Sequence, residues 1–189
     1  MSIGVQNTGA IQQTDEQTQW FAMRATYHRE MAVRMMLENA GIECYLPTTH
    51  QLKTLRGRKV RVEAPLVSSL IFVHAEKQRL QQFKARVPHL QYMTTRCSGK
   101  NVPIIVPQRQ MDDFITITTK ANRNLLFFQP GELNLQKGTP IRLHGGALDG
   151  VEGIFVKIDG RRNKRVVVEV EGVVSVVFES ADLFLEVLS

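Results

Sequence analysis

Residues 20–41, WFAMRATYHREMAVRMMLENAG, contain the first strand and the first helix that the sequence predicts. Residues 20–27 are apolar and aromatic enough for a buried strand. Residues 28–40 follow with apolar side chains at helical spacing, and Gly41 suits the left-handed position that ends a helix. We expect one apolar face to pack on a sheet, with Arg29, Arg34 and Glu38 pointing outward. This face comprises Met31, Ala32, Met35, Met36 and Ala40, with Val33 and Leu37 beside them.

The chain beyond Gly41 continues with strands and a second helix. β-Branched and aromatic runs predict strands over 42–49, 66–74, 90–95 and 102–106, and apolar spacing predicts a helix over 75–87. The order β-α-β-β-α-β favours one antiparallel sheet covered by helices. A shorter helical segment is expected over 109–119.

The last part of the chain reads as strands only. Alternating valines and a Glu171-Gly172 turn predict a hairpin, and short strands are expected over 139–144, 151–158, 165–171, 173–178 and 184–187. Short strands at this spacing favour a small barrel over a sandwich. The predicted fold class is therefore α+β, an amino-terminal antiparallel sheet with helices followed by a small β-barrel. We expect a disordered leader over 1–19, a first domain over 20–119, a linker over 120–136 and the barrel over 137–189.

Positive charge is confined to the first part of the chain. Residues 1–136 contain 17 Lys and Arg against 10 Asp and Glu, whereas residues 137–189 contain 7 against 8. A clustered cationic surface attracts phosphate backbones and acidic protein faces. The first domain is therefore the one expected to meet nucleic acid or an acidic partner.

The most concentrated charge lies between the second and third predicted strands. Five cations fall within nine residues around an Arg56-Gly57-Arg58 turn, which predicts a basic hairpin or loop tip. Such a tip could neutralise several phosphates of DNA or RNA, or it could be a solvated hairpin that charge keeps soluble. The residues alone leave both interpretations open. The five cations are Lys53, Arg56, Arg58, Lys59 and Arg61.

Several classes of function lack their sequence signals. The apolar runs are far shorter than a membrane span of about 18 residues, and residues 1–19 lack the parts of a secretory signal. Cys44 and Cys97 form no metal-binding spacing and are expected to be buried free thiols. No zinc-hydrolase, nucleophile-elbow or phosphate-loop motif occurs, and Asp112-Asp113 is explained by its place near a helix start. We therefore expect no enzyme, no cofactor and no metal.

Two linked segments resemble the NusG-type transcription factors. The amino-terminal resemblance rests on residues 20–24, 42–47, 56–59, 65–66 and 70–73, together with the helix that ends at Gly41. Residues 141–156, IRLHGGALDGVEGIFV, are similar to the KOW domain of the same proteins, with a turn formed by Gly146, Gly150 and Gly153. The segments 87–93 and 106–111 resemble most closely the specialised RfaH branch and, within it, the UpxY antiterminators of capsular-polysaccharide operons.

The resemblance implies a cytoplasmic regulator that binds the clamp helices of RNA polymerase and promotes read-through of a dedicated operon. Arg86 matches an arginine near the DNA-facing surface of RfaH, which adds it to the candidates for contact with non-template DNA or nascent RNA. The KOW domain would contact ribosomal protein S10 or Rho. We expect a stable barrel, a monomer and no membrane association. The residues matching the polymerase-binding patch are Arg24, Val67, Ser68, Leu70, Ile71 and Phe72.

Two other functions remain open at this point. A general NusG-type elongation factor would act on most genes, and its deletion would change the transcripts of many operons. A ribosome-associated or RNA-binding protein with a KOW domain would co-purify with ribosomal particles instead of polymerase.

Overall fold

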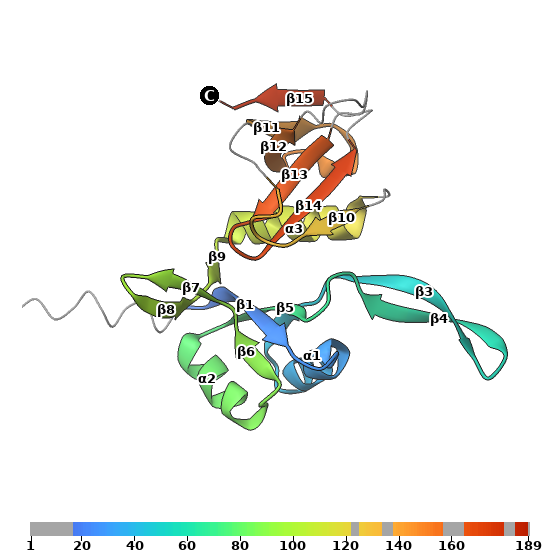
Figure 1. The fold of residues 1–189 in the computed structure, drawn as a ribbon, viewed down its shortest axis with the longest axis vertical. Coiled ribbons are helices and arrows are strands. Elements are labelled where there is room, and N and C mark those ends of the chain that lie inside the picture. Colours follow the sequence, from blue (N-terminus) through green and yellow to red (C-terminus); the bar gives the residue numbers. More distant parts are fainter. Residues whose placement is uncertain (1–16, 122–124, 134–137, 157–164, 180–183, 189) are drawn as a thin grey trace, which may run out of the picture.

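The computed structural model describes residues 17–121, 125–133, 138–156, 165–179 and 184–188, and Figure 1 shows two β-rich parts with a helix between them. The expected leader lies outside the described residues except for its last three. The first part contains β1 (Gln19–Ala25), α1 (Glu30–Asn39), β2 (Glu43–Tyr45), β3 (Thr48–Leu55), β4 (Arg58–Pro65), β5 (Leu70–Ala75), α2 (Lys77–Arg86), β6 (Leu90–Tyr92), β7 (Thr94–Cys97), β8 (Lys100–Pro103), β9 (Ile105–Val106) and α3 (Gln108–Lys120). The second contains β10 (Leu126–Phe128), β11 (Thr139–His144), a short 3-10 helix (Gly146–Leu148), β12 (Glu152–Val156), β13 (Arg165–Val170), β14 (Val174–Glu179) and β15 (Phe184–Val187).

The central sheet of the first part is antiparallel, with strand order β2-β5-β1-β6 and β9 paired to β1. Alternation along β1 places Phe21 and Met23 on the face covered by α1 and α2. Trp20 and Ala22 lie on the opposite face, where α3 packs. Because helices cover both faces, this sheet is buried on both sides and is not a half-exposed layer.

Helix α1 packs with a different face from the one expected. Glu30, Val33 and Leu37 are its buried residues, whereas the side chains of Met35 and Met36 are 60% and 49% exposed. Positions 30, 33 and 37 follow the i, i+3, i+7 spacing of one helical stripe, and the sheet covers only that stripe. The expected core face was therefore wrong for Met35 and Met36, whereas Met31 is partly buried and packs against the core beside Val33 and Leu37.

Two further elements differ from expectation. The strand expected over 42–49 is divided between β2 and β3, with Pro47, which has no backbone N–H for a ladder, in the gap. The segment expected as a linker contains β10, which pairs with β14. The second sheet therefore begins inside the expected linker, 120–136. The limits of the two domains remain a proposal.

The β-unit, defined here as β10 to β15, is one antiparallel sheet with strand order β10-β14-β13-β12-β11-β15. The predicted hairpin is confirmed, with Val170 opposite Val174 and Gly172 in a left-handed turn. Valines at alternate positions of β13 and β14 are fully buried. The α+β class expected from the sequence is confirmed.

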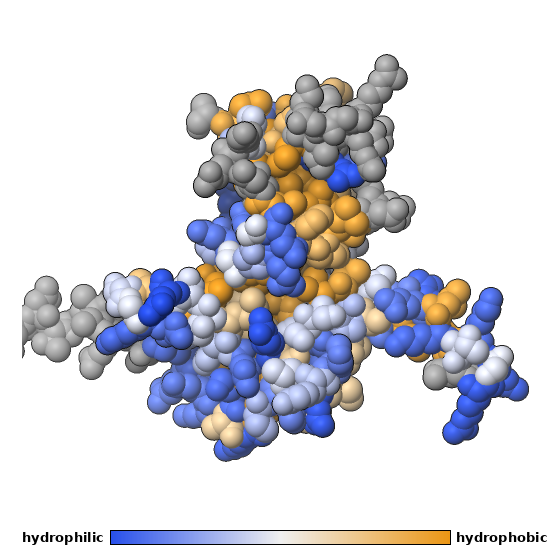
Figure 2. Space-filling model, viewed as in Figure 1, coloured by the Kyte–Doolittle hydropathy of each residue, from blue (hydrophilic) through white to orange (hydrophobic). Residues whose placement is uncertain are grey.

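Helix α3 lies between the two sheets (Figure 1). Its buried residues Met111, Phe114 and Ile117 belong to one apolar cluster that contains Trp20 of the first sheet and Val166 of the β-unit. Phe114 makes edge contacts with the rings of Phe72 and Tyr45. On the face seen in Figure 2, apolar residues of the upper part continue down to the boundary with the first part.

Candidate functional site

Four of the six residues matched to the polymerase-binding patch line one pocket of about 250 Å³. Arg24 follows the alternation of Trp20 and Ala22, so its exposed side chain lies on the α3 face of the sheet. Val67, Ser68 and Leu70 come from the turn before β5 and the start of that strand. The pocket therefore combines a cation with apolar and hydroxyl groups.

A buried carboxylate holds the turn that carries Ser68. Glu30 is only 3% exposed, and its Oε1 accepts a hydrogen bond from the backbone N–H of Ser69 at 2.6 Å. Ser69 has a left-handed φ of 62°, a conformation that non-glycine residues rarely adopt. The backbone N–H of Ala25 donates to the Ser69 carbonyl at 2.9 Å, which ties the turn to the end of β1. Sequence reasoning missed Glu30, although its spacing to Val33 and Leu37 places it on the buried stripe.

The other two patch residues are core side chains. Phe72 belongs to the cluster under α3, and Ile71 belongs to the cluster on the opposite face with α1 and α2. Both are 0% exposed. Their contact with polymerase stays a prediction. In the structure they pack β5 into the two apolar clusters on opposite faces of the sheet.

The β-unit lies over the same pocket. Val173 and Gln129 also line it, together with Ser69 and Met93 of the first part. Val67 and Leu70 are 8% and 4% exposed in this arrangement. Three polar contacts join α3 to the β-unit. Arg109 pairs with Glu152 at 2.6 Å, and the backbone N–H of Glu171 donates to Gln110 at 3.2 Å. The Asp113 carboxylate accepts a hydrogen bond from the backbone of Glu152. The pocket is thus a seam between the two parts.

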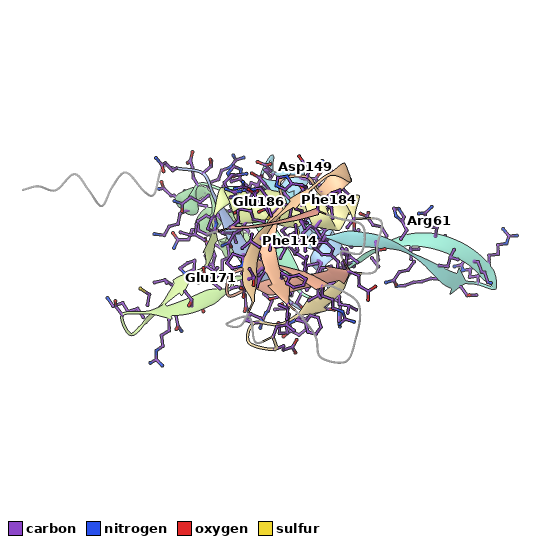
Figure 3. All side chains as sticks on the ribbon, turned by 90° about the horizontal axis from the view of Figure 1, so that it is seen from above. Arg61, Phe114, Asp149, Glu171, Phe184 and Glu186 are labelled. Atoms are coloured by element: carbon purple, nitrogen blue, oxygen red, sulfur yellow. The ribbon has the colours of Figure 1, made fainter. Side chains whose placement is uncertain are left out.

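The basic tip is the end of a long two-stranded hairpin. Strands β3 and β4 pair over eight positions, and Arg56 and Gly57 turn the chain with φ values of 49° and 77°. Positive φ at both central residues matches the right-handed twist of a hairpin. In Figure 3 the hairpin projects from the body with Arg61 on its outer half.

The register distributes the tip cations over both faces of the hairpin. Lys59 and Arg61 share a face with the exposed side chain of Leu52, while Lys53 shares the other face with Val60. Residues 51–62 include no acidic residue. Within the described part of the chain, none of the five tip cations is in an ion pair, so all are available to an external anion.

The root of the hairpin is anchored by charge. Glu63 accepts two hydrogen bonds from the Arg34 guanidinium at 2.9 and 3.1 Å and one from the Thr48 hydroxyl at 2.7 Å. The hydrogen bond from Arg34, followed by that from Thr48, lowers the pKa of the Glu63 carboxyl to about 2. Arg34 was expected to point outward from α1, and its partner there is Glu63 of the hairpin.

Arg86 lies apart from the tip. It is the last residue of α2, and Figure 1 shows α2 and the outer half of the β3–β4 hairpin on different sides of the first part. A nucleic acid would have to contact these two places separately.

The three glycines of the expected KOW turn have two different structural roles. Gly146 and Gly150 have left-handed φ values of 66° and 82° in the turn around the 3-10 helix. Gly153 lies in β12, where a Cβ would be 2.7 Å from the backbone oxygen of Val167. The motif thus combines two conformational requirements with one steric requirement.

Metal-ligating side chains do not gather in the described residues. No cluster of three potential metal-ligating side chains occurs there. Burial raises the pKa of the Asp113 carboxyl, which lies among Arg109, Glu152 and other groups at the seam. Burial also raises the pKa of the Cys44 thiol to about 11, which keeps it protonated at neutral pH. Cys97 is free, as expected, but exposed near a hairpin turn, so the expectation of burial was wrong for it.

Comparison with known families identifies the first part of the chain. Residues 18–115 match the family model described as transcription termination factor nusG. The chain belongs to the NusG family. Members of the NusG family are transcription termination and antitermination factors, not enzymes. No helix among the described residues is long and apolar enough to cross a membrane.

The remaining comparisons add little to the family assignment. A solved structure reported as a domain interaction in NusG from Thermotoga maritima matches with a TM-score of 0.40 and 17% identity, over 91% of this chain and 93% of that one. No curated protein matches the sequence.

Proposed function

We propose that this NusG-family protein binds the clamp helices of RNA polymerase through the pocket of Arg24, Val67, Ser68 and Leu70, and favours elongation over termination. The observation that carries the proposal is the convergence of these four residues, from two separate segments, on one hollow. A cation beside aliphatic side chains suits a partner helix with acidic and apolar residues.

Binding of a helix requires the β-unit to move. An α-helix with its side chains is about 10 Å across, which a pocket of about 250 Å³ between two packed parts does not admit. Val67 and Leu70 become available only when Val173 and its neighbours leave the seam. The polar part of the seam is small: on the described residues, α3 contributes one ion pair and two hydrogen bonds.

The β3–β4 hairpin supplies the nucleic-acid contact in this proposal. Its free cations would lie along phosphates of the non-template strand or nascent RNA, with Leu52 and Val60 beside them for contact with sugars or bases. The mechanism is therefore two-point attachment, with one contact on polymerase and one on nucleic acid. No step requires a cofactor.

The experiment measures binding of the full chain to core RNA polymerase and read-through in single-round transcription. Arg24→Glu should weaken polymerase binding by at least about tenfold, the loss of about 1.4 kcal/mol expected when a charge in a contact is reversed. Arg96→Glu is the matched control, because Arg96 is also an exposed strand arginine of the first part but lies outside the pocket. Equal binding by both variants contradicts the proposal.

Replacing the tip cations tests the second contact separately. Arg56→Ser, Arg58→Ser and Lys59→Ser together should lower read-through and reduce the salt dependence of nucleic-acid binding, by about 0.9 in log–log slope for each phosphate that the hairpin no longer neutralises. Arg96→Ser with Lys100→Ser, on the β7–β8 hairpin, is the control. Unchanged read-through and an unchanged salt slope in the tip variant remove the hairpin from the mechanism.

The specialised role rests on resemblance alone. Segments 87–93 and 106–111 are similar to UpxY proteins, so we propose that the target is one operon for capsular or exopolysaccharide synthesis, and that the β-unit has the KOW role of recruiting ribosomal protein S10 or Rho. Transcript profiling after deletion of the gene should show that transcripts of the distal genes of one operon are lost. Changes spread over most operons favour a general elongation factor.

A further inference from the structure

The outer edge of β14 is occupied by β10, a strand from the segment between α3 and β11. Leu126 pairs with Val177, Phe127 with Val176 and Phe128 with Ser175, all antiparallel. The remaining five strands pair among themselves without β10. β10 is therefore an added strand on an edge that the rest of the sheet would leave open.

The sequence of β10 is apolar, as expected of a strand that binds a sheet edge and not of a connecting segment. Residues 125–128 are Leu-Leu-Phe-Phe, in a stretch otherwise rich in polar residues. Leu125 and Phe127 pack against the apolar cluster, whereas Leu126 is 46% exposed. The β14 edge therefore binds an extended chain that has apolar side chains at alternate positions.

The attachment is short. β10 pairs over three positions, whereas β13 and β14 pair over six. Its phenylalanines are only partly buried, while Val176 opposite Phe127 is 0% exposed. A three-residue edge strand with half-exposed side chains opens far more readily than the strand beneath it.

We propose that the β14 edge is a strand-docking site, which β10 occupies in the free protein and which an extended segment of a protein partner takes over by displacing β10. Strand addition satisfies the N–H and C=O groups of β14 that loss of β10 would leave unpaired. The partner segment would have apolar or aromatic residues at alternate positions. This proposal deepens the recruiting role suggested for the β-unit and does not depend on polymerase binding.

Because β10 occupies the β14 edge, it competes with an external strand and weakens the apparent affinity of that strand for the protein. The apparent dissociation constant equals the intrinsic constant divided by the fraction of molecules in which the edge is open. A substitution that detaches β10 should therefore tighten binding of an external strand without any change in β14. Phe127→Asp does this, because it places a charge at an inward-facing position of β10. Leu126→Asp is the matched control on the neighbouring, exposed position.

The probe is a labelled peptide that copies residues 125–129 between pairs of lysines, with a second peptide carrying Asp at the Phe127 position as its control. The full chain is titrated by fluorescence anisotropy. We expect Phe127→Asp to bind the first peptide at least about tenfold more tightly than the unaltered chain or Leu126→Asp, which corresponds to an edge open in less than about a tenth of molecules. Equal affinity for all three proteins, or for the two peptides, contradicts the proposal.

If Phe127→Asp does not fold, amide hydrogen exchange on the unaltered protein tests whether the peptide displaces β10. Saturating peptide should accelerate exchange of the β10 amides and leave those of β14 protected. β10 amides that stay protected under these conditions overturn the proposal. Polymerase binding measured in parallel separates the two hypotheses, since Phe127→Asp acts on the β-unit and Arg24→Glu on the pocket.

Discussion

The Arg34 guanidinium donates two hydrogen bonds to the Glu63 carboxylate, at 2.9 and 3.1 Å, and so joins helix α1 to the root of the β3–β4 hairpin. Beyond this root the hairpin has exposed side chains on both faces. Isolated two-stranded hairpins are only marginally stable in water. The direction in which the tip cations point therefore depends on one ion pair and the strand ladder behind it.

Glu63→Gln should loosen the hairpin and remove its response to acid. The pKa of Glu63 is lowered from 4.5 to about 2, so its ionised form contributes stability that is complete above 4.5 and lost as pH falls through about 2. Backbone amide chemical shifts of Val62 and Ala64, followed by NMR from neutral pH to about 2, should move in the unaltered chain and not in Glu63→Gln. Glu38→Gln, which removes the longer Arg34 contact at 3.5 Å, should titrate like the unaltered chain. A hairpin transition near pH 4.5 would contradict the role assigned to Arg34.

Glu30→Ala should destabilise the protein and disturb the turn that carries Ser68. The substitution leaves the Ser69 N–H without its acceptor in a buried site, which costs about 1–3 kcal/mol. Urea unfolding measures the loss, and polymerase binding measures the displaced turn. Glu30→Gln keeps an acceptor oxygen at the same place and should recover most of both. Equal defects in the two variants would mean that the hydrogen bond is not what matters.

Gly153→Ala should separate β12 from β13. Its Cβ would lie 2.7 Å from the Val167 oxygen, so the strands must shift, at a cost of about 1–3 kcal/mol. Amides of both strands should exchange faster. Gly150→Ala has nothing within 4 Å of its Cβ and opposes only a left-handed φ of 82°, so exchange there should rise in the turn alone. The same pattern of exchange in both variants would contradict the steric explanation.

Arg109→Glu should raise polymerase affinity if the β-unit covers the binding pocket. The substitution replaces the 2.6 Å pair with Glu152 by a repulsion at the seam. Exposed pairs contribute up to about 1 kcal/mol, so a several-fold increase is expected. Lys120→Glu, with the same charge change at the last residue of α3, is the control. Lower or unchanged affinity in Arg109→Glu would show that the seam does not limit binding.

Local patterns predicted most elements of this fold because the deciding interactions are close in sequence. Alternating valines specified β13 and β14, and Arg56-Gly57 specified the hairpin turn. Partners far apart in sequence escaped prediction. The apolar face of α3 was readable from Met111, Phe114 and Ile117, but no local signal says that two sheets share it.

The sequence predicted several residues of the candidate site, but it did not predict how they are arranged in space. Resemblance supplied Arg24, Val67 and Ser68, while the position of Val173 over them follows only from how the β-unit docks. The burial of Glu30 was readable from its helical spacing, whereas its hydrogen bond to Ser69 depends on a loop 39 residues away. The strand at 126–128 lacked alternation with polar residues, so an apolar run was read as connecting chain.

One apolar cluster runs through α3 into both sheets, with Phe114 at 0% exposure within it. Two parts that share a cluster cannot melt independently while they are docked. Calorimetry of the free protein should give a single endotherm, and a destabilising change in either sheet should lower that one temperature. A partner that draws the β-unit away would divide the heat absorption into two steps, which makes thermal cooperativity a direct reporter of the released state.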